Sequence, residues 1–381
     1  MKSKTLKIAF LTVLVITAVA AAGPKSPTVL PARHDSAPSV QNLSAWLEAL
    51  AEMNPIDVHT HVFKEDPAFD GLLKNLKLRV LDICVIDDRD PFFKDLERQR
   101  NPTLNLVRSS SGRVAFCTTI SPYDFEEPGF SQRVNRQLNQ DFSAGAIAVK
   151  IYKTIGMEIR TKAGKYLMAD DPVFEPIYKN IAARHRTIVA HLAEPTSCWQ
   201  APNPASPDYD YYKKHPEEYA YLHPEWPSKA AILAARDHVL ATNPKLRVVG
   251  AHLGSMEVDV NEIAQRFDRY PNFAVDTAAR IPYFMLQPSD KVREFLIKYQ
   301  DRVLYGTDLG LMPEDKTAES LKEWISTYER DWKYFATDQT VEYNGHKVQG
   351  LRLPVSVLRK LYHDNAVRWI PGIAGGAHQS R

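Results

Sequence analysis

The sequence predicts an α/β protein, a (β/α)8 TIM barrel with its functional site at the carboxyl ends of the strands. Three observations support this fold class: short apolar runs recur along the chain, helical patterns lie between them, and several runs end in a polar residue. Eight buried strands that alternate with helices favour parallel βαβ units, and eight strands close a barrel. An open, doubly wound sheet is the alternative, but no Gly-rich phosphate loop follows the first apolar run.

The amino-terminal segment, residues 1–22, is typical of a secretory signal peptide. Three lysines lie near its start, the apolar run 8–19 follows, and small residues end it. That run is too short to span a bilayer comfortably, so an uncleaved membrane anchor is the secondary interpretation. Residues 23–41, rich in Pro and Ser, are expected to form a flexible linker. We therefore expect an exported protein, periplasmic or secreted, with a single domain over residues 42–381.

The strands and helices of that domain follow from apolar periodicity. A first helix is expected over 42–53, with Ser44 as its cap. The expected strands are, in order, 56–59, 78–86, 114–120, 146–152, 187–191, 246–252, 272–276 and 302–306. The helices expected between them include 172–184, 228–242, 257–269 and 289–300. After the last strand, the sequence predicts a long helix at about 315–336, a hairpin turn at Asn344-Gly345 and a closing helix over 354–369.

Charge and cysteine content limit the classes of partner. Removing the three lysines of the signal segment from the 48 basic residues leaves 45, against 46 acidic residues. With no excess of positive charge, nucleic acid and anionic membranes are poor partners, and we expect a small-molecule substrate. A homodimer is compatible with the sequence. The three cysteines are an odd number, which argues against a disulfide scaffold, and Cys84 and Cys117 lie in apolar runs typical of buried thiols.

His59-Thr60-His61 ends the first apolar run of the domain. Side chains at i and i+2 of a strand point to the same side, so these two imidazoles are able to chelate one metal ion. His-x-His alone is a weak signal. It gains weight because four later apolar runs end in Lys150, His191, His252 and Asp308.

Taken in order, the motifs resemble a known enzyme family. The motifs are Asp57-Val58-His59-Thr60-His61, residues 145–152, Asp170-Asp171-Pro172 leading to His191, residues 250–254, Tyr305-Gly306-Thr307-Asp308 and Asp364-Asn365-Ala366. Together they look like the amidohydrolase superfamily of metal-dependent TIM-barrel hydrolases, in its amidohydrolase-related (amidohydrolase 2) branch, over about residues 55–370. The resemblance implies a (β/α)8 barrel with a divalent metal ion at its carboxyl face. Its members include hydrolases, lactonases, hydratases and non-oxidative decarboxylases, so the resemblance defines the site better than the reaction.

The resemblance also implies a ligand set: His59, His61, His191 and Asp308. Zn²⁺ is our first choice for this set, and Mn²⁺ or Fe²⁺ would fit the same ligands. His252 matches a histidine that acts on the substrate in one-metal members and binds a second ion in two-metal members. Lys150 matches the position of a carboxylated bridging lysine in two-metal members; alternatively, its charge binds a substrate carboxylate or pairs with Asp308. We favour the one-metal interpretation.

Three functions remain open. Our first hypothesis is a hydrolase acting on a C–O or C–N bond of a lactone, ester or amide. In it, Asp308 accepts the proton of the attacking water and His252 stabilises the developing oxyanion. The second is a metal-dependent, non-oxidative decarboxylase, a carbon–carbon lyase that would use the same ligands. The third, a non-catalytic exported binding protein, is disfavoured by the complete ligand set.

A long, aromatic-rich insertion at about 194–227 follows the fifth strand. We expect it to overhang the metal and to contribute Trp199 and Tyr212 to substrate binding, and the alternative is that these aromatics only pack the insertion onto the barrel. Arg280 is expected either to bind a substrate carboxylate or to pair with Asp276 or Glu257. Lys153 and Arg160 are expected to be solvated charges.

Overall fold

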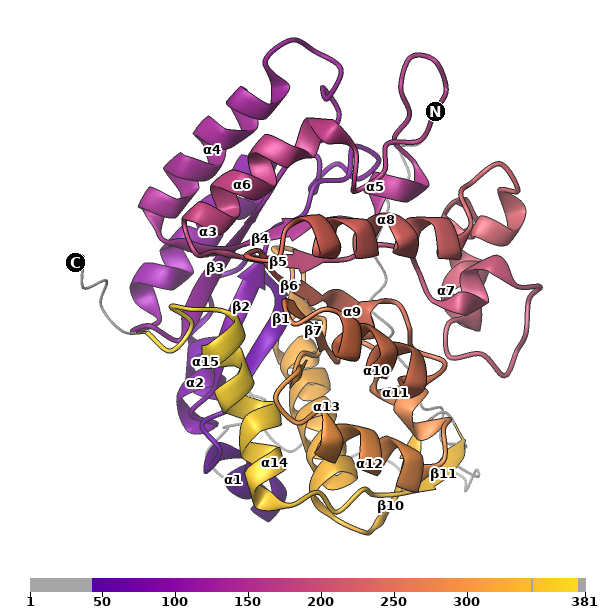
Figure 1. Cartoon of the computed structure of the whole chain (residues 1–381). Helices are drawn as coiled ribbons and strands as arrows, with labels where there is room; N and C mark the ends of the chain where they lie inside the picture. Colours follow the sequence, from indigo (N-terminus) through magenta and orange to yellow (C-terminus); the bar gives the residue numbers. More distant parts are fainter. Residues whose placement is uncertain (1–42, 344, 376–381) are drawn as a thin grey trace, which may run out of the picture.

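The computed structural model describes residues 43–343 and 345–375, so the predicted signal peptide and linker lie outside the described residues. Parallel strands form one curled sheet at the centre of the molecule, and helices surround it (Figure 1). The strand order is β8-β7-β6-β5-β4-β3-β2-β1-β9. The strands are β1 Ile56–Val62, β2 Arg79–Ile83, β3 Val114–Thr119, β4 Ala146–Ile151, β5 Thr187–Ala190, β6 Arg247–Gly250, β7 Phe273–Asp276, β8 Val303–Leu304 and β9 Leu309–Leu311.

The short strands β8 and β9 are two halves of the eighth barrel strand. β8 pairs with β7, and β9 pairs with β1. Between them, the N–H of Val58 donates to the carbonyl of Tyr305 at 3.0 Å, and the N–H of Asp308 donates to the carbonyl of His59 at 2.8 Å. These bonds join the last strand to the first, so the predicted (β/α)8 barrel is confirmed. Asp308 lies in the break of the strand, where its φ of +69° turns it out of the regular ladder.

The helices form the outer layer and agree with the sequence signals for their ends. They are α1 Ala45–Ala51, α2 Pro67–Asn75, α3 Leu96–Ser109, α4 Phe130–Ala144, α5 Thr154–Met157, α6 Glu175–Ala183, α7 Tyr209–Lys214, α8 Lys229–Thr242, α9 Ala251–Gly254, α10 Val260–Arg269, α11 Ile281–Met285, α12 Ser289–Lys298 and α13 Thr317–Ala336. Ser44 caps α1 through its side-chain oxygen, as the sequence predicts, and Ser228 caps α8 in the same way. The closing helix is interrupted: α14 Val355–Arg359 and α15 Asn365–Trp369 are separated by one π-helical turn.

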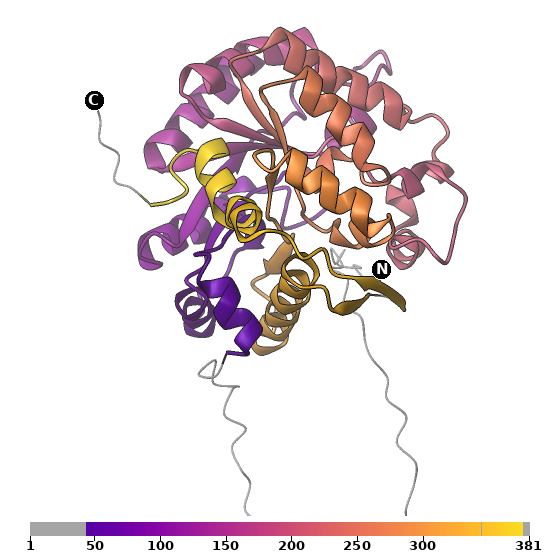
Figure 2. The ribbon, with the colours of Figure 1, turned by 60° about the horizontal axis from the view of Figure 1, so that its bottom comes forward.

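Two additions extend the barrel. α13 runs alongside α1, and the hairpin of β10 Thr340–Tyr343 and β11 His346–Gln349 projects from the body (Figure 2). Asn344 of the predicted turn lies outside the described residues. The insertion after β5 consists of α7 and short 3₁₀ turns at Thr196–Trp199, Pro216–Glu218 and Ala220–Leu222. Within the described ranges, no helix combines the length and apolar character needed to cross a membrane. All three cysteines are buried and unpaired, as expected.

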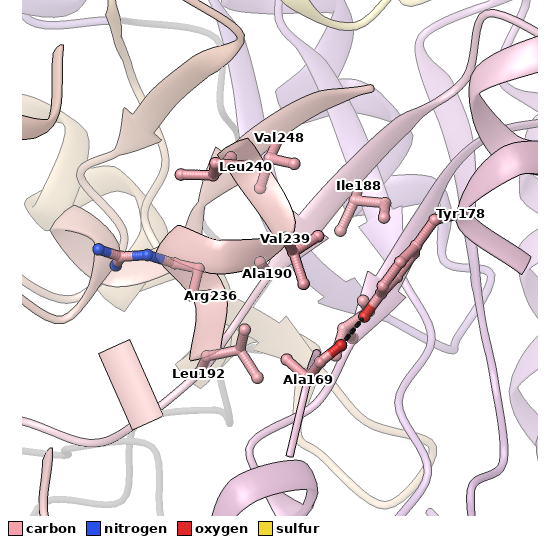
Figure 3. A pocket seen from close by; sticks show the side chains of 10 residues that line it. Ala169, Tyr178, Ile188, Ala190, Leu192, Arg236, Val239, Leu240 and Val248 are labelled. Atoms are coloured by element: carbon pink, nitrogen blue, oxygen red, sulfur yellow. Dashed lines mark hydrogen bonds between the residues drawn. The ribbon is translucent and has the colours of Figure 1, made fainter. Parts of the chain in front are cut away.

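The layer between the strands and the helices is closely packed. One cavity lies between β5, α6 and α8, with Ile188, Leu240 and Tyr178 in its wall (Figure 3). The Tyr178 hydroxyl is occupied, because it donates to the carbonyl of Ala169 at 2.7 Å. The cavity holds about 10 Å³, the least that one water molecule needs. It is therefore too small to bind a substrate.

Asp82 is a fully buried carboxyl group of β2 that accepts hydrogen bonds from the N–H of Val62 and the hydroxyl of Thr103. Burial raises its pKa to about 7, although both hydrogen bonds act to lower it. Since this pKa is raised, the folded protein binds the proton more tightly than the unfolded chain. The stabilisation is complete below about pH 4 and is lost as the pH rises through 7.

Asp82→Asn, which cannot ionise, is therefore expected to flatten the pH dependence of stability. The free energy of unfolding of the wild type falls between pH 5 and 8 as Asp82 ionises. In the variant this fall should be smaller by roughly 2–4 kcal/mol. Urea titrations at several pH values measure this difference. A slope equal to that of the wild type would show that Asp82 is already ionised in the folded protein at pH 5.

Candidate active site

The residues singled out in the sequence lie at one end of the barrel. His59 and His61 are in the second half of β1, and Lys150 is in the last pair of residues of β4. His191 and His252 follow β5 and β6, and Asp308 follows β8. Because all the strands are parallel, their carboxyl ends meet at one mouth. The alternation of side chains along β1 places both of its imidazoles on the same side of the strand.

His59, His61 and Asp308 form a compact group. One potential ligand atom from each lies within 4.8 Å of the others. The Nε2 atoms of His59 and His61 are each 3.4 Å from Oδ1 of Asp308. His59 is fully buried, whereas the Asp308 side chain keeps 27 % of its surface exposed. Solvent therefore reaches the group at Asp308.

Hydrogen bonds fix which nitrogen of each imidazole faces the centre. Nδ1 of His59 donates to Oδ2 of Asp276 at 2.9 Å, and Nδ1 of His61 donates to the carbonyl of Ile83 at 2.8 Å. With a proton on each Nδ1, the Nε2 lone pairs point toward the carboxylate of Asp308. A ring nitrogen oriented by an acceptor on its other side is the usual arrangement of a histidine that binds a metal.

The donor set fits a divalent cation. Each of the two Nε2 atoms lies 3.4 Å from Oδ1 of Asp308, and a cation between the nitrogen and oxygen lone pairs would offset their repulsion. Two ligand atoms held at about 2.1 Å by a tetrahedral ion are about 3.4 Å apart, which is the observed spacing. Nitrogen and oxygen ligands suit zinc, manganese and iron alike, so the three residues define a metal site without selecting the metal.

His191 and His252 extend the group by one ring each. The His252 ring lies 4.8 Å from the His59 ring and 4.2 Å from the His191 ring, measured between centroids. Nδ1 of His252 donates to the carbonyl of Ala278 at 3.0 Å, which leaves its Nε2 as the acceptor. Nε2 of His191 is buried and has no hydrogen-bond partner among the described residues. The structure thus brings three of the four expected ligands together and places the ring of His191 beside that of His252.

Burial keeps the imidazoles neutral. Desolvation lowers the pKa of His191 to about 4, against the opposing effect of Glu194. Burial also lowers the pKa of His59 and holds that of His252 well below its usual range. For Asp308, burial acts to raise the pKa, but its interactions with His61, His59 and Lys150 hold it well below the usual value. At neutral pH, His59, His191 and His252 are therefore neutral nitrogen donors near one ionised carboxylate.

Lys150 is almost completely buried, and its Nζ lies 2.9 Å from Nε2 of His59. In the described part of the chain its ammonium forms no ion pair within 4 Å, so the expected pair with Asp308 is not formed directly. Burial lowers the pKa of Lys150, while Asp308 and Asp276 act in the opposite direction. Lys150 is therefore a buried amino group whose contact, within the described residues, is with an imidazole and not with a carboxylate.

The turn that carries His252 has an unusual backbone. Four successive residues, His252 to Ser255, have φ between +57° and +61°, a left-handed conformation that costs about 1–2 kcal/mol for each residue other than glycine. Two side chains from other elements hold it: Arg236 of α8 donates to the carbonyl of Gly254, and Asp276 accepts the N–H of His252. The hydroxyl of Ser255 adds a bond to the carbonyl of Ala193.

Two of the expected charges behave differently from the sequence interpretation. Lys153 is buried, with Nζ 2.5 Å from Glu194 and 2.7 Å from Glu218, so its prediction as a solvated charge was wrong. The reason is that the insertion folds over it and supplies Glu218.

Arg160 is a surface charge, as expected. Arg280 is buried near Glu194 and Asp208, at 3.8 and 4.0 Å, and these are its ion-pair partners instead of Asp276 or Glu257.

Sequence reasoning overlooked two carboxylates that matter here. Asp276 contacts His59 and the backbone of His252, and Glu194 links Lys153, Arg280 and His191. The signal for Asp276 was present, because it ends an apolar run just as Asp308 follows one. Glu194 had no such signal, since it lies four residues beyond the end of β5.

The insertion is anchored across the mouth of the barrel. Its Glu218 pairs with Lys153 after β4, the N–H of Thr196 donates to Glu257 after β6, and Asp208 accepts from Tyr283 after β7. Tyr212 is buried and stacks on Tyr219, with ring centroids 5.0 Å apart. The indole of Trp199 donates to the carbonyl of Pro227 at 3.2 Å. Both aromatics therefore hold the insertion in shape, and an effect on substrate would come through its position.

Tyr212→Ala should loosen the insertion without disturbing the metal ligands. We expect KM to rise by about three- to ten-fold with unchanged metal per chain, because removing a buried aromatic stack costs packing free energy. Steady-state kinetics and metal analysis on the same preparation measure the two quantities. Tyr212→Phe, which keeps the stack, is the matched control. A lower melting temperature with an unchanged KM would assign Tyr212 to packing alone.

Comparison with known proteins was consistent with this architecture. A family model described as Amidohydrolase matches residues 56–371. No curated protein matches the chain in sequence. Similar solved structures include a 2,6-dihydroxybenzoate decarboxylase complexed with 2,6-dihydroxybenzoate, at 13% identity and a TM-score of 0.50, covering 83% of this chain and 98% of that one.

Two further solved structures are similar to this chain. A dihydroxybenzoic acid decarboxylase from Polaromonas sp. JS666, with bound manganese and the inhibitor 2-nitroresorcinol, has 12% identity and a TM-score of 0.50, covering 84% of this chain and 97% of that one. A dihydroorotase from Campylobacter jejuni has 12% identity and a TM-score of 0.39, covering 83% and 82%. At these identities the likeness concerns the fold alone.

Proposed function

The chain belongs to the amidohydrolase family, and from that premise we propose that it is an exported, metal-dependent hydrolase. Its substrate class would be a small lactone, ester or amide that carries an anionic group. The observation that carries this proposal is the arrangement of two oriented imidazoles around the ionised, partly exposed carboxylate of Asp308. A carboxylate in that position serves both as a ligand and as a proton acceptor.

His59, His61 and Asp308 would hold the ion, with His191 beside them. We favour Zn²⁺, and Mn²⁺ or Fe²⁺ would fit the same donors. When bound, the ion supplies Lewis-acid activation of water and of a substrate carbonyl. Asp308 accepts the proton of the attacking water and returns it to the leaving group. The ion would therefore stabilise the negative charge that develops on the substrate, while Asp308 transfers the proton.

His252 and Lys150 would act on the substrate. Nδ1 of His252 is committed to Ala278, so its Nε2 is the atom that faces the reacting group. The ammonium of Lys150, buried and without a carboxylate partner nearby, would bind the anionic group of the substrate. The buried guanidinium of Arg280 is already shared between two carboxylates, which makes it the weaker candidate for that contact.

A decarboxylase is the second candidate, favoured by the same buried cation. Lys150 would then bind the carboxylate that leaves as carbon dioxide, and Asp308 or Nε2 of His252 would first take up a proton from water and then pass it to the carbon. The two dihydroxybenzoate decarboxylases of similar fold suggest which substrates to test for this alternative.

The two reactions differ in whether water enters the product. We expect metal-loaded enzyme, screened against lactones, esters and amides in ¹⁸O-labelled water, to release acids with one labelled oxygen. Aromatic hydroxy acids tested in parallel, with detection of carbon dioxide, cover the decarboxylase. Release of carbon dioxide, with no ¹⁸O in the organic product, would overturn the hydrolase proposal in favour of the lyase.

A further inference from the structure

Asp276, the last residue of β7, uses both of its carboxylate oxygens inside the site. Oδ2 accepts the Nδ1–H of His59 at 2.9 Å. Oδ1 accepts the backbone N–H of His252 at 2.8 Å and that of Ala278 at 3.1 Å. The side chain is fully buried, so water does not compete for these bonds. One carboxylate therefore contacts the ring of His59 and the backbone that carries His252.

The proton on the His59 ring is fixed from both sides. An ionised carboxylate only accepts hydrogen bonds, so Asp276 requires the proton on Nδ1. On the opposite side, Nζ of Lys150 lies 2.9 Å from Nε2, and an ammonium only donates. Both contacts select the same tautomer, with no proton on Nε2. The Nε2 lone pair accepts from Lys150 in this structure, and an ion bound to Nε2 would replace that contact.

The other oxygen of Asp276 acts on the left-handed turn of residues 252–255. His252, the first of them, has φ +58° and ψ +48°, a conformation that a histidine adopts only when its surroundings hold it. Its N–H is bound by Asp276, and its ring is bound by the carbonyl of Ala278, whose own N–H also donates to Asp276. The position of the His252 ring thus depends on the same carboxylate as the tautomer of His59.

We propose that Asp276 is a positioning residue that couples metal binding to the placement of His252, by fixing the His59 tautomer with one oxygen and the left-handed turn with the other. The proposal rests on the metal site proposed above, although its tautomer component is measurable without any metal. In this role Asp276 does not contact the substrate.

Asp276→Asn separates the two roles, because the amide has only one acceptor. Two backbone N–H groups point at the Oδ1 position, so the amide oxygen must remain there and the NH₂ group must face His59. An NH₂ group donates, which forces the His59 proton onto Nε2. We expect the Zn²⁺ affinity to fall by about 10- to 100-fold, the usual effect of losing an orienting partner of a metal-binding histidine.

The tautomer is read directly by NMR of metal-free protein labelled with ¹⁵N-histidine, with His59→Gln to assign the signals. We expect Nδ1–H at His59 in the wild type and Nε2–H in Asp276→Asn. Zn²⁺ affinity is measured by competition with a chelator. Asp82→Asn is the matched control, since Asp82 is also a buried strand carboxyl group but contacts no histidine ring; its Zn²⁺ affinity should stay within about three-fold of the wild type.

Unchanged tautomer and affinity in Asp276→Asn would overturn the proposal. If that variant does not fold, Lys150→Met keeps the proposal falsifiable. With the donor at Nε2 removed, His59 should still carry its proton on Nδ1, because Asp276 holds it there. A shift of the proton in Lys150→Met would show that Lys150 sets the tautomer. A wild type that binds no Zn²⁺ but has the expected tautomer would count against the proposed function and not against this role of Asp276.

Discussion

Asp308→Asn is expected to lower kcat by about a thousand-fold or more and to weaken metal binding at the same time. Asn has nearly the shape of Asp and tolerates the φ of +69° found at this position, so the backbone need not change. It lacks both the negative charge that faces the two imidazoles and the basicity needed to accept a proton. Both defects come from one atom substitution.

Metal per chain, measured by mass spectrometry, and kcat at saturating metal separate these two defects. If excess metal restores occupancy, the remaining loss of kcat measures the role of Asp308 as a base. Asp82→Asn serves again as the control, because it removes a buried carboxyl group whose hydrogen bonds go to the N–H of Val62 and the hydroxyl of Thr103 and not to an imidazole. Wild-type turnover in Asp308→Asn would exclude Asp308 as the proton acceptor.

His252→Asn is expected to lower kcat by about a hundred-fold or more and to leave the metal content unchanged. Asn is again suitable, because it accepts the left-handed conformation of residue 252 better than other side chains do. His252 is not a member of the group formed by His59, His61 and Asp308. Its loss should therefore remove an interaction with the substrate and none with the ion.

Lys150→Met tests the number of metal ions together with His252→Asn. In the one-metal arrangement, both variants retain one equivalent of metal per chain. In a two-metal arrangement, His252 binds the second ion and a carboxylated Lys150 bridges the pair, so each variant loses about one equivalent. Loss of metal in both would replace the one-metal assignment and make Lys150 a ligand.

Much of the barrel was determined by local sequence patterns. Strand positions follow from apolar runs such as Val248 and Val249 of β6, whose burial depends on their hydrophobicity and not on the identity of distant partners. Helix ends follow from caps such as Ser44 and Ser228. The two-residue period of a strand predicts that His59 and His61 lie on the same side of β1. The position of Asp308 after an apolar run predicts that it lies at the carboxyl mouth of the barrel.

Only the tertiary structure decided which of these side chains meet and how each is charged. The bond from His59 to Asp276 spans 217 residues, and no local pattern specifies an interaction at that separation. The sequence predicts an exposed charge at Lys153 because its partner Glu218 is distant in the sequence. The insertion brings Glu218 to Lys153 only in the folded protein. The tautomer of His59, the left-handed turn at His252 and the break in the eighth strand at Asp308 arise when the barrel closes, since closure brings together hydrogen-bond partners that are far apart in the sequence.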